Sequence, residues 1–88
     1  QAIGIMESFS LATMIICADQ ILKAAELEAI ELRLGNGLGG KAYFTYTGDV
    51  AAVKSGTEAG EAIAREKGLL VNYEVIPSPS EVLVPSLL

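Results

Sequence analysis

A glycine-rich turn that leads directly into an alternating segment constrains this fold more than any other feature. Four glycines lie between positions 35 and 40, and after them Ala42, Phe44 and Tyr46 alternate with Tyr43, Thr45 and Thr47. This alternation predicts a strand at 41–47 with one buried face. The segment 27–34 alternates as well, with Ile30, Leu32 and Leu34 expected to be half-buried. The two segments therefore predict a hairpin around the glycine turn.

The same turn matches two nucleotide-binding patterns by spacing alone. Gly35, Gly37 and Gly40 fit G-x-G-x-x-G, and the stretch 35–41 fits the front of a phosphate-binding loop. Both motifs need a helix directly after the glycines, because the N–H groups at a helix start face the phosphate. Here a strand follows, and Ala42 stands where a Ser or Thr would hold magnesium. We therefore interpret the turn as a connection between strands.

The remaining sequence predicts two more strands and two helices. The strands are expected at 2–7 and 69–76, and the helices begin after the N-cap residues Ser10 and Asp49. Gly68 is expected to end the second helix in a left-handed conformation. This order of elements predicts an α+β domain of the ferredoxin-like split β-α-β type. Its four-stranded antiparallel sheet would carry both helices on one face.

Both helices carry apolar positions at steps of three and four, which are typical of a core-facing stripe. In the first helix these positions are Leu11, Met14, Ile15, Ala18, Ile21, Leu22 and Ala25. In the second helix they are Val50, Val53, Gly60 and Ile63. Gly56 and Gly60 would let a neighbouring backbone approach closely, and packing of this helix on the sheet is the simplest interpretation.

Length and composition limit the partners. The 88 residues are interpreted as one domain at 1–79 and an apolar tail at 80–88, which is expected to dock on its own domain or on a neighbour. A net charge of −5 with six Lys and Arg leaves no basic stripe for nucleic acid. No apolar run approaches the roughly 20 residues of a membrane span. Neither nucleic acid nor a membrane is therefore an expected partner.

Residues that carry catalytic or metal chemistry are scarce. The chain has no histidine, and Cys17 alone cannot form an internal disulfide or a metal cluster within one chain. We expect a buried thiol, a reducing compartment and no metal site. An enzyme could use Glu7, Glu31 and Glu74, yet their spacing groups no acid–base pair. The prediction is a protein without catalytic residues.

Four segments, in order, resemble the shell domain of bacterial microcompartments, the BMC domain. They are AIGIMES at 2–8, ADQILKAAELEAIEL at 18–32, TGDVAAVKSGTEAG at 47–60 and VIPSPSEVL at 75–83. The resemblance implies a structural protein of the cytoplasmic microcompartment shell. It implies a homo-oligomer, either a hexamer or a trimer of tandem domains, that forms a hexagonal tile with a central pore for metabolites. Other shell proteins, and indirectly the encapsulated enzymes, are the implied partners.

The resemblance also implies a pore loop and a contact between tiles. The implied pore loop consists of Asn36, Gly37, Leu38, Gly39 and Gly40. Leu38 departs from the glycine that hexamers usually carry there. Lys23 matches a lysine at the edge between tiles. Ser78 falls at an edge position where hexamers commonly carry arginine, and a serine lacks the planar fork of donors of that residue.

These departures are most similar to the C-terminal half of tandem-domain shell proteins, in particular the propanediol-type iron–sulfur shell protein. In that subclass a pore-loop cysteine of the first domain holds the cluster. Leu38 stands at the matching position here, so the resemblance implies no cofactor in this chain and leaves a cluster to another domain of a tandem parent. Two other functions stay open: a small ferredoxin-like regulatory domain that binds a metabolite at a subunit interface, and a small carboxylate enzyme.

Overall fold

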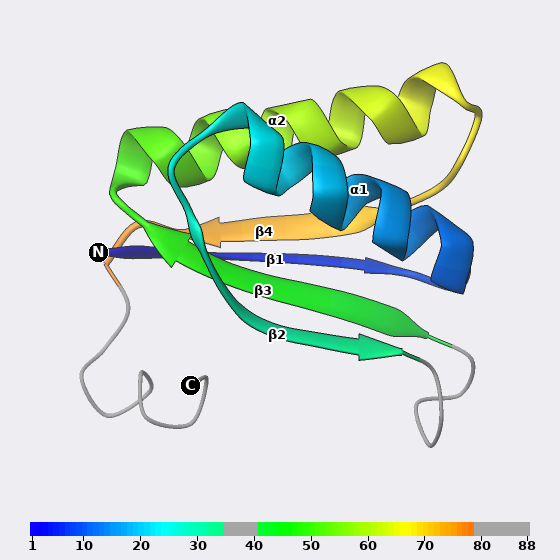
Figure 1. The fold of residues 1–88 in the computed structure, drawn as a ribbon, viewed down its shortest axis with the longest axis horizontal. Helices are drawn as coiled ribbons and strands as arrows, with labels where there is room; N and C mark the ends of the chain where they lie inside the picture. The colour runs from blue at the N-terminus through cyan, green and yellow to red at the C-terminus, as the bar shows by residue number, and fades with distance from the viewer. Residues whose placement is uncertain (35–40, 79–88) are drawn as a thin grey trace.

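The computed structural model describes residues 1–34 and 41–78, which form a four-stranded sheet covered on one face by two helices (Figure 1). The elements are β1 (Ala2–Ser8), α1 (Leu11–Ala24), β2 (Glu28–Leu34), β3 (Ala42–Gly48), α2 (Val50–Glu66) and β4 (Asn72–Ile76). The strand order is β2-β3-β1-β4, and every neighbouring pair is antiparallel. The predicted fold class and element order are confirmed.

The register of the two central strands explains where the core lies. Met6 pairs with Phe44, and Gly4 pairs with Tyr46, so these side chains share the helix-facing side of the sheet. The alternation predicted for 42–47 is therefore confirmed, because Phe44 and Tyr46 are buried and their rings stack 5.1 Å apart. The core is completed from the helices by Met14, Cys17, Ala18, Ile21, Val53 and Ala64.

Two glycines in α2 bring the helices close together. A Cβ added at Gly60 would lie 2.8 Å from Ile21 Cγ1, and one added at Gly56 would lie 3.1 Å from Ile21 Cγ2. The close approach expected at these glycines is confirmed. Its partners are Ile21 of α1 for both glycines and, for Gly56, also Leu27, whose Cδ1 would lie 2.5 Å from the added Cβ. Packing on the sheet, the simplest interpretation, holds at Gly60 as well, since its added Cβ would lie 3.2 Å from Met6 Cε of β1.

The predicted helix caps are confirmed. The Ser10 side chain accepts a hydrogen bond from the Thr13 N–H at 3.2 Å, and Asp49 Oδ1 accepts one from the Ala52 N–H at 2.8 Å. Gly68 has φ +70°, and the following Leu69 N–H donates back to the Ala64 carbonyl at 2.8 Å. This left-handed ending satisfies carbonyls that the helix leaves without a partner.

Two sequence predictions were wrong in extent. The last strand begins at Asn72 and not at Leu69, because the Leu69 N–H is used by the helix ending and the next residues cross from α2 to the sheet. The apolar stripe of α1 is only partly buried, since a helix buries the side that faces its neighbours. Apolar positions that were expected to be covered but are exposed are Leu11, Ile15, Leu22, Leu32, Leu34 and Val50.

Candidate functional site

The residues that flank the predicted pore loop lie at one end of the sheet, which we call the loop end (residues 8–10, 34, 41 and 68–71). Leu34, the last residue of β2, pairs with Ala42, the first residue of β3, at this end. Lys41 Nζ lies 3.5 Å from Glu7 Oε1 and 5.5 Å from the centre of the Phe9 ring. The predicted pore residues 36–40 lie outside the described residues, and their role stays a prediction.

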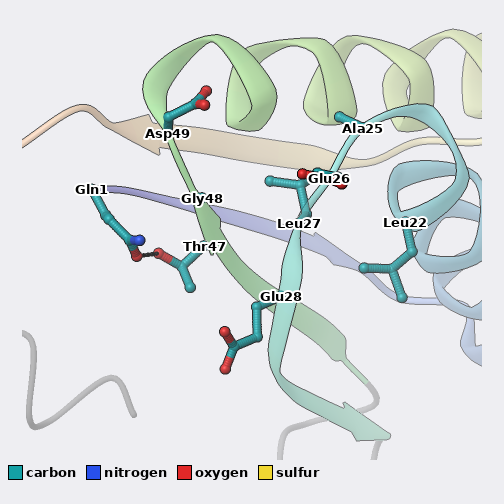
Figure 2. Close-up of a pocket in the computed structure, with 9 residues that line it drawn as sticks. All are labelled: Gln1, Leu22, Ala25, Glu26, Leu27, Glu28, Thr47, Gly48 and Asp49. Atoms are coloured by element: carbon teal, nitrogen blue, oxygen red, sulfur yellow. Dashed lines mark hydrogen bonds between the residues drawn. The ribbon is translucent and has the colours of Figure 1, made fainter.

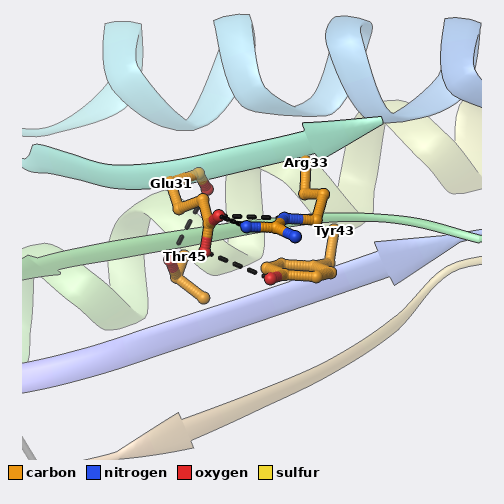
Figure 3. A network of polar contacts seen from close by, with 4 residues as sticks. All are labelled: Glu31, Arg33, Tyr43 and Thr45. Carbon is orange, nitrogen blue, oxygen red and sulfur yellow. Dashed lines mark hydrogen bonds and ion pairs between the residues drawn. The ribbon is translucent and has the colours of Figure 1, made fainter. Parts of the chain in front are cut away.

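A polar network occupies the sheet face opposite the helices (Figure 3). The Arg33 Nε and Nη2 groups donate to Glu31 Oε2 at 3.0 and 2.6 Å. The Tyr43 hydroxyl donates to Glu31 Oε1 at 3.1 Å, and the Thr45 hydroxyl donates to the Glu31 carbonyl at 3.5 Å. The hydrogen bonds from Arg33, and then that from Tyr43, lower the pKa of the Glu31 carboxyl. Glu31 is therefore a charged acceptor at neutral pH.

The three carboxylates considered for catalysis are divided between different surroundings. Glu31 is held by Arg33 on the edge strand β2, and Glu7 is in its ion pair with Lys41. Glu74 pairs with Ile5 across β1 and β4, which places it diagonal to Glu7. Glu7 and Glu74 thus lie on neighbouring strands. Glu7 is paired with Lys41, however, and Glu31 lies on a different strand in its pair with Arg33.

The opposite end of the sheet, which we call the turn end (residues 23–28, 47–49 and 77–78), carries an open groove of about 610 Å³ (Figure 2). Nine residues line it: Gln1, Leu22, Ala25, Glu26, Leu27, Glu28, Thr47, Gly48 and Asp49. Its walls come from the α1–β2 connection and from the β3–α2 connection. Three of these residues carry carboxylates, so the groove is acidic.

The two predicted edge residues are exposed at this turn end. Lys23 Nζ forms an ion pair with Asp19 Oδ2 at 2.9 Å, with both side chains largely exposed. Ser78 follows the end of β4 and is exposed as well. Sequence reasoning missed Asp19 as the partner of Lys23, although their spacing of four residues in a helix was a usable signal. It also missed the Arg33–Glu31 pair, whose signal was opposite charges two residues apart on one strand.

Cys17 is a core residue. Its side chain is fully buried, its thiol donates to the Gly60 carbonyl at 3.5 Å, and burial raises the pKa of that thiol. Within residues 1–34 and 41–78, no group of three or more His, Cys, Asp or Glu side chains could hold a metal ion. In the same part of the chain, no helix is long and apolar enough to cross a membrane.

Comparison with known proteins decides the family. The BMC domain family matches residues 2–79. The chain belongs to the BMC-domain family. It is a structural, non-enzymatic protein of the bacterial microcompartment shell in the cytoplasm, and proteins of this family oligomerise into shell tiles. The predictions of a shell protein and of a non-enzyme are therefore confirmed, in place of the regulatory domain and the carboxylate enzyme.

Individual relatives differ in how much of their length this domain covers. The chain is 41% identical to the shell protein PduT of Citrobacter freundii over 92% of its own length, but it spans only 44% of PduT. It is 38% identical to the shell protein EutM of Escherichia coli and spans 79% of that protein. A microcompartment protein of Desulfitobacterium hafniense shares 46% identity with a TM-score of 0.89, and the chain spans 47% of it. The chain thus spans about half the length of PduT and of the D. hafniense protein.

Proposed function

We propose that this domain is one of six BMC domains that surround the pore of a hexagonal shell tile. Two features of the fold support this proposal, one at each end of the sheet. The loop end carries the hairpin that the family resemblance assigns to the pore, and the turn end carries the exposed residues Lys23 and Ser78 that it assigns to the contact between tiles. A domain of this kind works by assembly and by selective passage of metabolites.

We further propose that the domain is the C-terminal half of a two-domain chain, so that three chains supply the six domains. The coverage of the relatives supports a two-domain chain, and the resemblance of the sequence alone supports the C-terminal half. The higher identities, 41% and 46%, occur with PduT and with the D. hafniense protein, of which the domain spans 44% and 47%. Identity is lower, at 38%, with EutM, which it spans for the most part.

In this proposal the pore lining of this domain is Leu38, Gly39 and Gly40. Pores select by their width and by the dipoles and side chains that line them. Glycine residues expose backbone N–H and C=O groups to a passing polar solute, whereas Leu38 adds apolar surface. The proposed passage therefore depends on geometry and needs no catalytic group in this chain.

The chain itself supplies no iron–sulfur ligand in this proposal. Cys17 donates to the Gly60 carbonyl inside the core, so its thiol does not face a symmetry axis where a cluster could bind. Leu38, at the pore position, has no donor atom in its side chain. If a two-domain parent holds a cluster, the ligands come from its other domain.

Native mass spectrometry of the 88-residue chain tests the tile. Six copies, 6 × 9.2 kDa or about 55 kDa, would support a tile that this chain can complete alone. A monomer or dimer would favour the two-domain parent, because half of the tile domains would then be missing. An open-ended or irregular series of masses would contradict a closed tile of six domains.

A further inference from the structure

The sheet face that points away from the helices carries an apolar patch near the turn end, built by Ile3, Ile5 and Ile76. Ile3 pairs with Ile76 across β1 and β4, and Ile5 lies two residues further along β1, so the three side chains share one face. It is the face opposite that of Met6, which belongs to the core beneath the helices. We call these three residues the isoleucine patch.

Ile3 is buried without belonging to that core. It is only 3% exposed, whereas every other buried apolar side chain in the described part of the chain belongs to one cluster between the sheet and the helices. Thr47 and Ile76, its partners on the two neighbouring strands, flank it from the sides. Thr45, the partner of Ile5 on the same face, is also buried, at 5%. Because strand neighbours flank a side chain and do not cover its tip, burial on this face calls for a further layer.

The rest of this face is polar. Glu74 pairs with Ile5 at one side of the patch, and the network of Glu31, Arg33 and Tyr43 lies toward the loop end (Figure 3). The patch is therefore a confined apolar area, and a segment that covers it should be apolar and short.

The chain supplies such a segment directly beside the patch. β4 ends at Ile76, which is itself part of the patch, and the described residues end two positions later at Ser78. Nine extended residues reach about 30 Å, farther than the whole of the seven-residue strand β1. The tail at 80–88 has Glu81 as its single charged side chain, and its apolar residues are Val82, Leu83, Val84, Leu87 and Leu88.

The surroundings of Ile76 limit where this tail can lie. Pro77 and Pro79 have no N–H group that could extend the ladder with β1, so the strand pairing stops at Ile76. The helix-facing side of the sheet is already filled by α1 and α2. The groove at the turn end is also within reach, but its three carboxylates would repel Glu81. The isoleucine patch is the remaining apolar surface next to the end of β4.

We propose that residues 80–88 fold back over the isoleucine patch of their own domain. The apolar side chains of the tail and of the patch then remove each other from water, which is favourable for both. The contact is made within one chain and does not depend on the proposed tile. It decides which surface this side of the domain shows to a partner, because the patch is covered and the network around Arg33 stays open.

Methyl NMR of the full 88-residue chain, labelled at Ile, Leu and Val, tests the proposal. We expect nuclear Overhauser effects from the methyl groups of the tail to Ile3, Ile5 and Ile76, and none to Ile15, which is exposed on α1. A second sample mixes chains labelled only at Ile with chains labelled only at Leu and Val. The same signals should be absent from this mixture, because the tail and the patch that touch belong to one chain.

A pair of matched double variants gives a second readout. Leu83→Asp/Leu87→Asp places two charges on the apolar side chains of the tail, and Ser80→Asp/Ser86→Asp places the same two charges on its serines. A soluble gadolinium chelate should relax the Ile5 and Ile76 methyl groups several-fold faster in the leucine variant and about equally in the serine variant and the unmodified chain. Ile21, which is fully buried in the core, should stay protected in all three and so report an intact fold.

Three results would overturn the inference. They are an absence of signals between the tail and the patch, signals that persist in the mixed sample, and equal relaxation of Ile5 and Ile76 in the two double variants. Each of them would leave the proposed tile standing, since the mass of the assembly is measured separately.

Discussion

Tyr46 of β3 and Thr57 of α2 are joined by a buried hydrogen bond of 2.6 Å between their hydroxyl groups. Thr57 Oγ1 also donates to the Val53 carbonyl at 2.8 Å, which uses its only proton. Tyr46 is therefore the donor to Thr57. The Tyr46 ring lies over Gly4 of β1, so one side chain ties together both central strands and the second helix.

Replacing Tyr46 with phenylalanine should weaken this link without opening a large cavity. The Thr57 hydroxyl keeps its bond to the Val53 carbonyl, so no buried donor is left without a partner. We expect a loss of about 1 kcal/mol in the free energy of unfolding, the usual worth of one hydrogen bond. Urea unfolding followed by circular dichroism would measure it. Thr57→Val, which removes the same bond and also the one to Val53, should cost at least as much.

The same pair predicts how stability changes in alkali. Burial raises the pKa of Tyr46 above its ordinary value of 10.0, the hydrogen bond to Thr57 opposing this in part. The folded state therefore holds this proton more tightly than the unfolded state does. The resulting stability is fully present below about pH 10 and is lost as the pH rises through the folded pKa. Burial raises the pKa of Cys17 as well, so this thiol adds a further loss of stability that begins above its ordinary pKa of 9.0.

The difference between the unmodified chain and Tyr46→Phe removes the separate contribution of Cys17, which is common to both. The charge of Cys17 also raises the Tyr46 pKa, so it acts on the difference in the same direction as burial. We expect this difference in unfolding free energy to be constant from neutral pH to about pH 9 and to narrow above about pH 10. Unfolding curves collected across this range would show it. A difference that widens in alkali would mean that the Tyr46 pKa is shifted in the other direction.

Gly4→Ala should be among the most damaging single-methyl changes in the domain. A Cβ at this position would overlap the Tyr46 ring, which cannot move aside easily because its hydroxyl is bound to Thr57. Overpacking of this kind costs about 1–3 kcal/mol, and more where the neighbour is rigid. Thermal and urea unfolding would measure the loss. In a Tyr46→Leu background the same alanine should cost much less, and an equal cost in both backgrounds would contradict the overlap.

Gly68→Ala is the informative comparison, because its expected cost has a different origin. No atom lies within 4 Å of a Cβ at Gly68, but its φ of +70° is left-handed. The expected loss is about 1–2 kcal/mol from the backbone alone, and it should not depend on residue 46.

Local signals in the sequence predicted the fold well. Ser10, Asp49 and Gly68 act within one helical turn, so their roles follow from neighbouring residues without knowledge of the rest of the chain. Periodicity also identified the helices correctly. It overestimated burial at Ile15 and Leu22, because a repeat of three and four shows that an apolar face exists and not that this domain alone covers it.

The candidate site was predicted less completely, since its parts depend on distant residues. The link from Tyr43 to Glu31 requires the strand register, and the groove at the turn end requires two connections that are far apart in sequence. The exposure of the segment between α2 and β4 was missed for the same reason. Leu70 was interpreted as part of a strand, whereas the structure places it in the crossing from α2 to β4 and exposes it.

Lys23→Ala should weaken the association of tiles into sheets and leave the individual tile intact. The ion pair of Lys23 with Asp19 is exposed, and such helix pairs contribute only tenths of a kcal/mol, so domain stability should be nearly unchanged. Electron microscopy would measure the assembly of tiles into sheets, and native mass spectrometry would measure the assembly of chains into tiles. Lys54→Ala, on an exposed position of α2, controls for the loss of one positive charge. Sheets formed equally well by Lys23→Ala and by the unmodified chain would show that Lys23 is not at the contact between tiles.

Leu38→Glu should change the passage of ions through the pore of the tile and should leave the stability of the domain unchanged. If Leu38 lines the pore, the substitution adds a ring of carboxylates, which attract cations and repel anions. We expect cation selectivity to rise in conductance measurements on assembled tiles, and Leu38→Ser, which is polar but uncharged, to change it much less. If Leu38 lines an open pore, the free energy of unfolding should change by no more than about 0.5 kcal/mol, as is usual for substitutions at exposed positions. A large loss of stability in both variants would place Leu38 in the core, and unchanged selectivity in a stable Leu38→Glu tile would place the pore lining elsewhere.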